Sequence, residues 1–308
     1  MPVFENRVGL NITRKKLQFL EVCYDREGFI LENIDEAFFD DELDLLHNKE
    51  TKVHALLQSA LNDIIIKNPV KSSFVSLSLP IDFFYIHHIP YDNTLLSYDL
   101  VEQFRWEFSV LHPYENFNDF SFQYYEIEKN NFVPYHSALV ASINRRIIKT
   151  VLAFMQANNF KLKFIDNAHF SFDKALQFSD PFFVQGLIMS LCYSNSRLSI
   201  ELLFEGKPVF YKSYGINNAG EIVSFIKNFI AESDIMKSSG SLKQRAYIFG
   251  EEISDSILEQ LNKQLPVKFS RLNPFSNIYI NPALKENKCL TQKPYSFAPA
   301  AGISYRLI

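Results

Sequence analysis

The sequence holds only three cysteines, Cys23, Cys192 and Cys289, and they lie far apart in the chain. No two of them have the CxxC spacing of a zinc ribbon or a redox motif, and an odd, scattered set does not make a disulfide framework. We therefore expect neither a cysteine-based metal site nor disulfides. Such a chain suits a reducing compartment.

Long apolar runs and an excess of positive charge are also missing. The nearest candidate for a membrane span, 182–193, is short and contains Gln185 and Ser190, so it suits a buried strand better. Residues 1–20 carry charges throughout and lack the apolar core of a secretory signal. The formal net charge of −4 gives no general attraction to nucleic acid or to an anionic membrane. We expect a cytoplasmic protein that is not itself inserted in a membrane.

The common catalytic motifs are absent from the sequence. No serine stands in a GxSxG elbow, and no Cys–His spacing indicates a thiol nucleophile. His87 and His88 are adjacent in an apolar run that reads as a strand, so their side chains point to opposite faces and cannot share one metal ion. The other histidines are isolated in the sequence. No catalytic residue and no metal ligand is predicted.

Aromatic residues, in contrast, are abundant, with 30 Phe and 15 Tyr in 308 residues. Such a content indicates an aromatic core, an aromatic recognition surface, or both. Eight of these residues gather in one block: Phe83, Phe84, Tyr85, Phe104, Trp106, Phe108, Tyr114 and Phe117. The sequence leaves open which of them fill a small core and which line a groove. As candidates for a partner groove we take Phe83, Phe84, Tyr85, Trp106 and Tyr114.

The hydrophobic pattern repeats one order of elements twice. In the first copy, period-two segments are followed by a segment of helical period and one more strand. These segments are 7–12, 17–24 and 29–34, then the helix 52–67, then the strand 73–79. The acidic stretch 35–44 between them reads as a solvated loop or a helix start.

The second copy has strands at 187–193, 198–204 and 208–213, a helix that begins after Asn217 and Asn218, and a strand at 246–249. A duplicated β-β-β-α-β order predicts an α/β protein with two related lobes and a cleft between them. Residues 1–81 and 167–186 are assigned to the core of lobe I, and 187–308 to lobe II. Residues 82–166 read as a small α/β subdomain inserted in lobe I.

Five short segments carry a resemblance to a known family. They are Val8-Gly9-Leu10-Asn11-Ile12-Thr13, the segment 111–115 (LHPYE), the hairpin 191–206, the pair of motifs Asn273-Pro274-Phe275 and Asn281-Pro282, and the tail 297–306. In this order and spacing the chain resembles PilM, a member of the actin-like ATPase (ribonuclease H-like) fold related to FtsA. The resemblance implies two phosphate-binding hairpins, and a groove between lobe I and the inserted subdomain. That groove would grip the short cytoplasmic tail of a single-span inner-membrane partner.

The chain departs from the family pattern where ATP and Mg²⁺ would bind. Asn11 stands at the first acidic position, Cys192 at the second, and Ser194 replaces a glycine. Only Gly250 remains of the adenosine-side glycine pair, and two glutamates follow it. The degenerate nucleotide-site positions are Gly9, Asn11, Thr13, Arg14, Lys15, Cys192, Ser194, Ser196 and Gly250. Magnesium requires hard oxygen ligands, so we expect that ATP hydrolysis is lost and that no cofactor is used.

Three functions stay open at this point. The favoured one is a non-catalytic cytoplasmic adaptor of a type IV pilus or type II-like secretion platform, held at the inner membrane through its partner. A second is a divergent actin-fold ATPase or kinase, with Asp25, Glu205 or Glu251 as the displaced acidic residue. A third is a free-standing interaction protein. The turn Thr13-Arg14-Lys15-Lys16 either holds a phosphate in a nest of N–H groups or is simply solvated.

Overall fold

A computed structural model describes residues 6–25, 28–240 and 244–306. Its contacts divide the chain into two compact units. The first unit is Met1–Ile81, Arg146–Pro181 and Leu272–Ile308, and the second is Asp82–Arg145 and Phe182–Arg271. Within the described ranges, no helix combines the length and apolar character needed to cross a bilayer.

The first unit is built on a six-stranded sheet in the order β14-β3-β2-β1-β4-β8. The strands are β1 Arg7–Ile12, β2 Lys16–Asp25, β3 Gly28–Phe38, β4 Phe74–Leu79, β8 Lys161–Asn167 and β14 Tyr279–Ile280. The first three form an antiparallel meander, and β4 lies parallel to β1 and to β8. All six residues of β1 are buried, because the strand lies in the middle of the sheet and both of its faces are covered.

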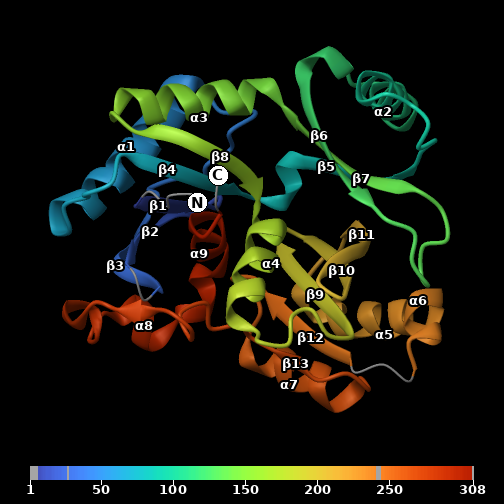
Figure 1. Cartoon of the computed structure of the whole chain (residues 1–308). Helices are drawn as coiled ribbons and strands as arrows, with labels where there is room; N and C mark the ends of the chain where they lie inside the picture. The colour runs from blue at the N-terminus through green and yellow to red at the C-terminus, as the bar shows by residue number, and fades with distance from the viewer. Residues whose placement is uncertain (1–5, 26–27, 241–243, 307–308) are drawn as a thin grey trace. The chain divides into compact units, whose positions relative to one another are not determined.

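Helices cover both faces of this sheet. Figure 1 shows α1 (Glu50–Lys67) and α3 (Arg145–Ala157) on one side, with α4 (Ala168–Ser179) and α9 (Ala298–Ser304) on the other. The remaining helical segments of the unit are α8 Lys288–Gln292 and the 3-10 turns η1 Ile81–Phe83, η4 Pro282–Leu284 and η5 Pro294–Phe297, of which η1 runs on into the second unit. Buried residues recur along α1 at helical spacing, as its sequence predicts.

The second unit contains a five-stranded sheet in the order β11-β10-β9-β12-β13. Its elements are β9 Leu187–Ser194, β10 Arg197–Phe204, β11 Lys207–Gly215, η3 Ala219–Glu221, α5 Ile222–Glu232, α6 Asp234–Ser238, β12 Gln244–Phe249, α7 Asp255–Gln264 and β13 Phe269–Ser270. The neighbours and directions of β11-β10-β9-β12 repeat those of β3-β2-β1-β4. The predicted duplication is confirmed.

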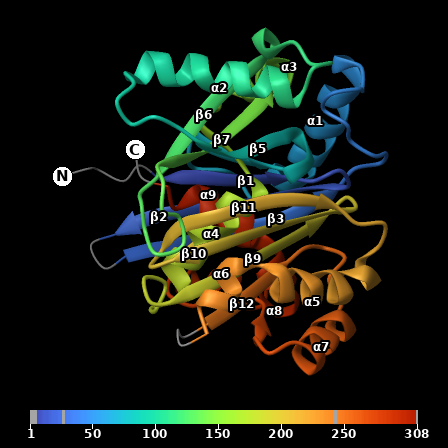
Figure 2. The same cartoon turned by 90° about the vertical axis from the view of Figure 1, so that its right-hand side faces the viewer.

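A three-stranded antiparallel sheet, β5-β7-β6, forms the rest of the second unit. Its elements are β5 Phe84–Pro90, α2 Ser97–Leu111, η2 Phe117–Asp119, β6 Phe120–Ile127 and β7 Ser137–Asn144. Leu100 and Phe104 of α2 pack against Ile89, Ala138 and Val140 of the sheet. Figure 2 shows α2 lying along this sheet. The inserted subdomain thus has a small apolar core of its own.

The contacts divide the chain differently from the boundaries expected from the sequence. Residues 272–308, expected in lobe II, group with the first unit because β14 pairs with β3 and α9 packs on β1. Residues 146–166, expected in the inserted subdomain, also group there, because β8 pairs with β4. The inserted part is therefore 82–145. It groups with 182–271 in the second unit and not with the first unit. The stretch 35–44 is not all loop, since β3 continues to Phe38.

Candidate functional site

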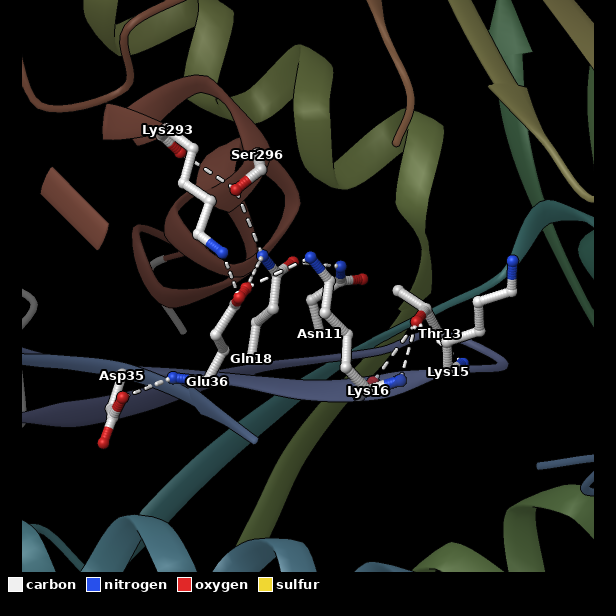
Figure 3. Close-up of polar contacts among 9 residues, drawn as sticks. All are labelled: Asn11, Thr13, Lys15, Lys16, Gln18, Asp35, Glu36, Lys293 and Ser296. Carbon is white, nitrogen blue, oxygen red and sulfur yellow. Dashed lines mark hydrogen bonds and ion pairs between the residues drawn. The ribbon is translucent and has the colours of Figure 1, made fainter. Parts of the chain in front are cut away.

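The first predicted phosphate hairpin joins β1 to β2 through a tight turn at Thr13. The backbone N–H groups of Lys15 and Lys16 donate to Thr13 Oγ1 over 3.2 and 3.1 Å, and the N–H of Thr13 donates to the carbonyl oxygen of Lys16 over 3.0 Å. Figure 3 shows the Thr13 hydroxyl above this backbone. The hydroxyl thus already accepts from two of the amide donors that a phosphate nest would offer.

The cations of this turn are not equivalent. Arg14 forms an ion pair with Glu42 at 3.5 Å. Lys16 is buried and forms an ion pair with Glu36 at 3.1 Å. Lys15 alone of these three is exposed. One of the two alternatives for this turn was that its cations are simply solvated. That alternative is wrong for Lys16, because its side chain is buried in the interior of the unit.

Asn11 begins a chain of amide hydrogen bonds across the sheet. Its Nδ2 donates to Gln18 Oε1 over 2.9 Å, and Gln18 Nε2 donates to Glu36 Oε2 over 3.2 Å and to Ser296 Oγ over 3.3 Å. Asn11, Gln18 and Glu36 are direct partners in the β1–β2–β3 register, so their side chains share one face. Figure 3 shows this row, with Ser296 reaching it from the C-terminal segment.

Glu36 is the charged centre of this network. Its carboxylate accepts from Lys16 Nζ and from Lys293 Nζ. Burial alone would raise the pKa of Glu36, but the hydrogen bond from Lys293 and the charge of Lys16 outweigh it and hold that pKa below its ordinary value. Glu36 is therefore ionised at neutral pH. The strand register could have revealed Gln18 and Glu36, whereas Lys293 lies 257 residues from Glu36 and gave no signal in the sequence.

These groups do not fit a magnesium ion. One carboxylate and two ammonium groups give the network a net charge of +1, which repels a divalent cation. Within the described residues, the buried Oδ1 of Asn11 accepts no hydrogen bond, but a single amide oxygen is a poor ligand set for an ion that prefers several hard oxygens. We derive no chemical step through ATP or Mg²⁺ at this hairpin.

Gly9 has a packing role in the structure. A Cβ at this position would lie 2.1 Å from the carbonyl oxygen of Ala300 and 2.8 Å from Cβ of Ser304, both on α9. Gly302 on α9 permits a matching close approach to Ser171 on α4. Gly9 lies within β1, before the turn, so it gives α9 room against the strand and does not open the turn to a phosphate.

The second predicted phosphate hairpin joins β9 to β10. Its two turn residues, Asn195 and Ser196, have φ of 51° and 57°, the left-handed pair of a tight type I′ hairpin. Cys192 is completely buried in β9, Ser194 is half-buried at the strand end, and Ser196 is exposed. Asn195 Nδ2 donates to Asp82 Oδ1 over 3.2 Å. None of the three predicted positions in this hairpin presents a carboxylate.

Gly250 follows β12 with φ of 149°, a backbone conformation that favours glycine. A Cβ here would lie 2.2 Å from the carbonyl oxygen of Tyr193 on β9. The neighbouring Glu251 and Glu252 are exposed in the turn that follows. Gly250 therefore permits a close backbone approach, and two carboxylates lie next to it. Glu205, another candidate acid, is exposed in the β10–β11 turn, and the side chain of Asp25 lies outside the described residues.

A cavity of about 280 Å³ lies between α2 and the sheet of the inserted subdomain. It is lined by Val101, Phe104, Phe122, Gln123, Tyr124 and Val140. Most of this lining is apolar or aromatic, and Gln123 is exposed. The cavity has the composition of a site that receives an apolar side chain of a ligand.

The predicted groove residues lie elsewhere on the subdomain. Tyr85 packs inward, with its ring 4.2 Å from that of His112, and Phe83 and Phe84 are half-buried. Trp106 is 62% exposed on α2, and Tyr114 is fully exposed just after it. Two of the five groove candidates are thus exposed, and none of the five lines the cavity, although Phe104 of the predicted aromatic block does.

The two units and the repeated sheets define the actin-like ATPase fold. No family model and no curated protein matches the chain in sequence. Among solved structures, the chain is similar to the PilM–PilN type IV pilus biogenesis complex, with a TM-score of 0.72, 15% identity and 98% of each chain covered.

Two more solved structures share this fold at lower similarity. A Bacteroides thetaiotaomicron protein with an actin-like ATPase fold and unknown function has a TM-score of 0.51 and 12% identity, with 86% of this chain and 90% of that chain covered. The ethanolamine utilization protein EutJ from Carboxydothermus hydrogenoformans has a TM-score of 0.51 and 8% identity, with 99% and 90% covered. The expected fold class is confirmed.

Proposed function

We propose that this chain is a non-catalytic component of a type IV pilus or type II-like secretion platform. It binds the short cytoplasmic tail of an inner-membrane protein and stays at the cytoplasmic face of that membrane through this partner. The likeness in fold to the PilM of a PilM–PilN complex supports the choice of pathway. The nearly complete coverage of both chains supports a similar overall architecture.

Our proposal that the chain is not an enzyme rests on the Lys16–Glu36–Lys293 cluster beside Asn11. An actin-like ATPase holds a metal ion near the end of its first strand, whereas here an amide and a carboxylate paired with two ammonium groups occupy that region. Phosphoryl transfer depends on a positioned metal ion, and a network with a net charge of +1 does not attract one. Binding of a partner is the activity that such a unit retains.

The mode of binding is a peptide that docks on the inserted subdomain. The cavity beside α2 receives an apolar side chain, and the exposed Trp106 and Tyr114 provide aromatic contact area nearby in the chain. Aromatic residues are common in binding hot spots because they bury much area with few rotatable bonds. A helix or extended segment laid along α2 fits this mode.

Fluorescence anisotropy with labelled tail peptides tests the proposal. The peptides are the cytoplasmic tails of single-span inner-membrane proteins from the same genome. Val101→Arg places a charge in the cavity and is expected to weaken binding at least about tenfold. Ile66→Arg on α1, where Ile66 is 81% exposed, is the matched control and keeps wild-type binding. Failure of every tail to bind, or equal binding by Val101→Arg, contradicts the adaptor function.

The competing function is a divergent ATPase or kinase. Steady-state phosphate release from Mg-ATP distinguishes it from an adaptor. Turnover that Asn11→Ala abolishes supports the enzyme and overturns our proposal, whereas no turnover leaves the adaptor as the function to pursue.

A further inference from the structure

Two histidines that are 25 residues apart in the sequence face each other in the inserted subdomain. His87 lies on β5 and His112 caps the C-terminal end of α2, and their Nε2 atoms are 2.8 Å apart. Both side chains are half-buried. His88, the neighbour of His87, points away from this pair, with its Nε2 2.6 Å from Ser137 Oγ.

Aromatic rings hold the pair in place. The ring of Tyr85 lies 4.2 Å from that of His112, and Phe108 contacts the same imidazole at 4.9 Å between centroids. The hydroxyl of Tyr85 donates to Glu115 Oε1 over 3.1 Å, so a carboxylate is fixed beside the cluster. The two imidazoles therefore converge beside aromatic rings, and the Glu115 carboxylate lies close enough to His112 to act on its charge.

The distance of 2.8 Å between the two Nε2 atoms fits one hydrogen bond and leaves no room for a proton on both atoms, so at least one Nε2 presents a lone pair. Two neutral imidazoles at this distance share one hydrogen bond, in which one Nε2–H donates to the lone pair of the other. Moving that proton to Nδ1 of its own ring leaves two Nε2 lone pairs that converge, with no net release of a proton.

We propose that His87 and His112 bind a divalent transition-metal ion of the zinc class through their Nε2 atoms. Neutral imidazole is the preferred ligand of such ions. In a tetrahedral site with Zn–N bonds of about 2.0–2.1 Å, two ligand nitrogens lie about 3.3 Å apart, so the rings must separate by about half an ångström and rotate until both lone pairs point to the ion. Water completes the coordination, and the Glu115 carboxylate favours the positive charge.

The bound ion would cross-link two elements of the inserted subdomain. It would join β5 directly to the end of α2, the helix that walls the cavity described above. Because the ion binds the folded form, it would also raise the temperature of unfolding. This site does not depend on the proposed adaptor function, and either can fail without the other.

The test is titration of the full chain with Zn²⁺ against a chromogenic chelator, with long-range ¹H–¹⁵N spectra of the histidine rings. We expect the Nε2 resonances of His87 and His112 to shift together, and His87→Gln and His112→Gln each to weaken binding at least about tenfold. His88→Gln, on the same strand, is the matched control and keeps wild-type affinity.

Thermal unfolding of the metal-free variants shows whether they fold, and the spectra of the wild-type chain need no variant. Zn²⁺ should raise the unfolding temperature of the wild type and of His88→Gln, but not that of His87→Gln or His112→Gln. Resonances of His87 and His112 that stay in place while other histidines shift would overturn the proposal, as would equal affinity of all the variants.

Discussion

At the scale of single residues, the interior of the first unit contains charges that depend on each other. Glu36 and Lys16 each have a side chain only 6% exposed, and they compensate one another at 3.1 Å. Removing one partner of a buried pair leaves an uncompensated charge, which costs far more than the pair contributes. The arrangement is therefore sensitive to single substitutions and tolerant of paired ones.

Glu36→Gln is expected to lower the free energy of unfolding by about 3–5 kcal/mol, because Lys16 stays buried without its carboxylate. Urea unfolding followed by circular dichroism measures this change. Glu42→Gln removes the exposed partner of Arg14 and should cost less than about 1 kcal/mol. Equal effects of the two substitutions would show that the Glu36 network is no more important than a surface pair.

The ionisation of Asp166 is expected to make the free energy of unfolding depend on pH. Burial raises the pKa of Asp166 to about 6, against the lowering effect of the Arg306 charge 2.5 Å away. The folded state then holds this proton more tightly than the unfolded one, so stability falls as pH rises from about 4 to about 6, by up to about 3 kcal/mol. Asp166→Asn should remove this fall in urea unfolding measured across that range. Parallel curves for the variant and the wild type would contradict the assignment.

At the scale of elements, the strands of the two repeats could be predicted and the C-terminal segment could not. β1 has apolar residues at every second position and α1 has them at helical spacing, and these periods decided the type of each element. The helix α9 has the sequence APAAGIS, in which every residue is buried, so no period exists to read. Its place follows from small residues that fit against Gly9 and Ser171, a contact that only the folded chain creates.

The candidate sites show the same limit. The sequence placed Asn11 in the first predicted phosphate hairpin, and it showed that aromatic residues gather in the inserted subdomain. It could not predict that Lys293 and Ser296 reach Glu36 and Gln18, nor that His112 meets His87, because these pairs are joined by tertiary packing and not by spacing. Trp106 and Tyr114 were predicted to line a partner groove and are exposed, but they are not among the residues of α2, β6 and β7 that line the cavity.

Gly9→Ala tests the contact between β1 and α9. The new methyl group would lie 2.1 Å from the carbonyl oxygen of Ala300, so the helix must move, at a cost of about 1–3 kcal/mol. Gly215→Ala is the matched control, because its Cβ meets nothing within 4 Å. The control should stay within about 0.5 kcal/mol of the wild type in urea unfolding. A Gly9→Ala protein as stable as the control would contradict the packing role of Gly9.

At the scale of the whole molecule, one strand order is used twice, and each copy closes its hairpin with its own side chains. In the first unit Thr13 accepts from the turn amides, and in the second a two-residue turn is held by Asn195 and Asp82. The repeated architecture is thus present with Asn11 and Cys192 at the two positions where the resemblance implies acidic residues. This agrees with our proposal that the chain acts by binding a partner.

The most direct test of this account is isothermal titration of the full chain with ATP in the presence of Mg²⁺. We expect no magnesium-dependent binding, because the Glu36 carboxylate of the Lys16–Glu36–Lys293 cluster is already paired with two ammonium groups, and the net charge of +1 repels a divalent ion. Micromolar binding that requires Mg²⁺ and disappears in Asn11→Ala would contradict it.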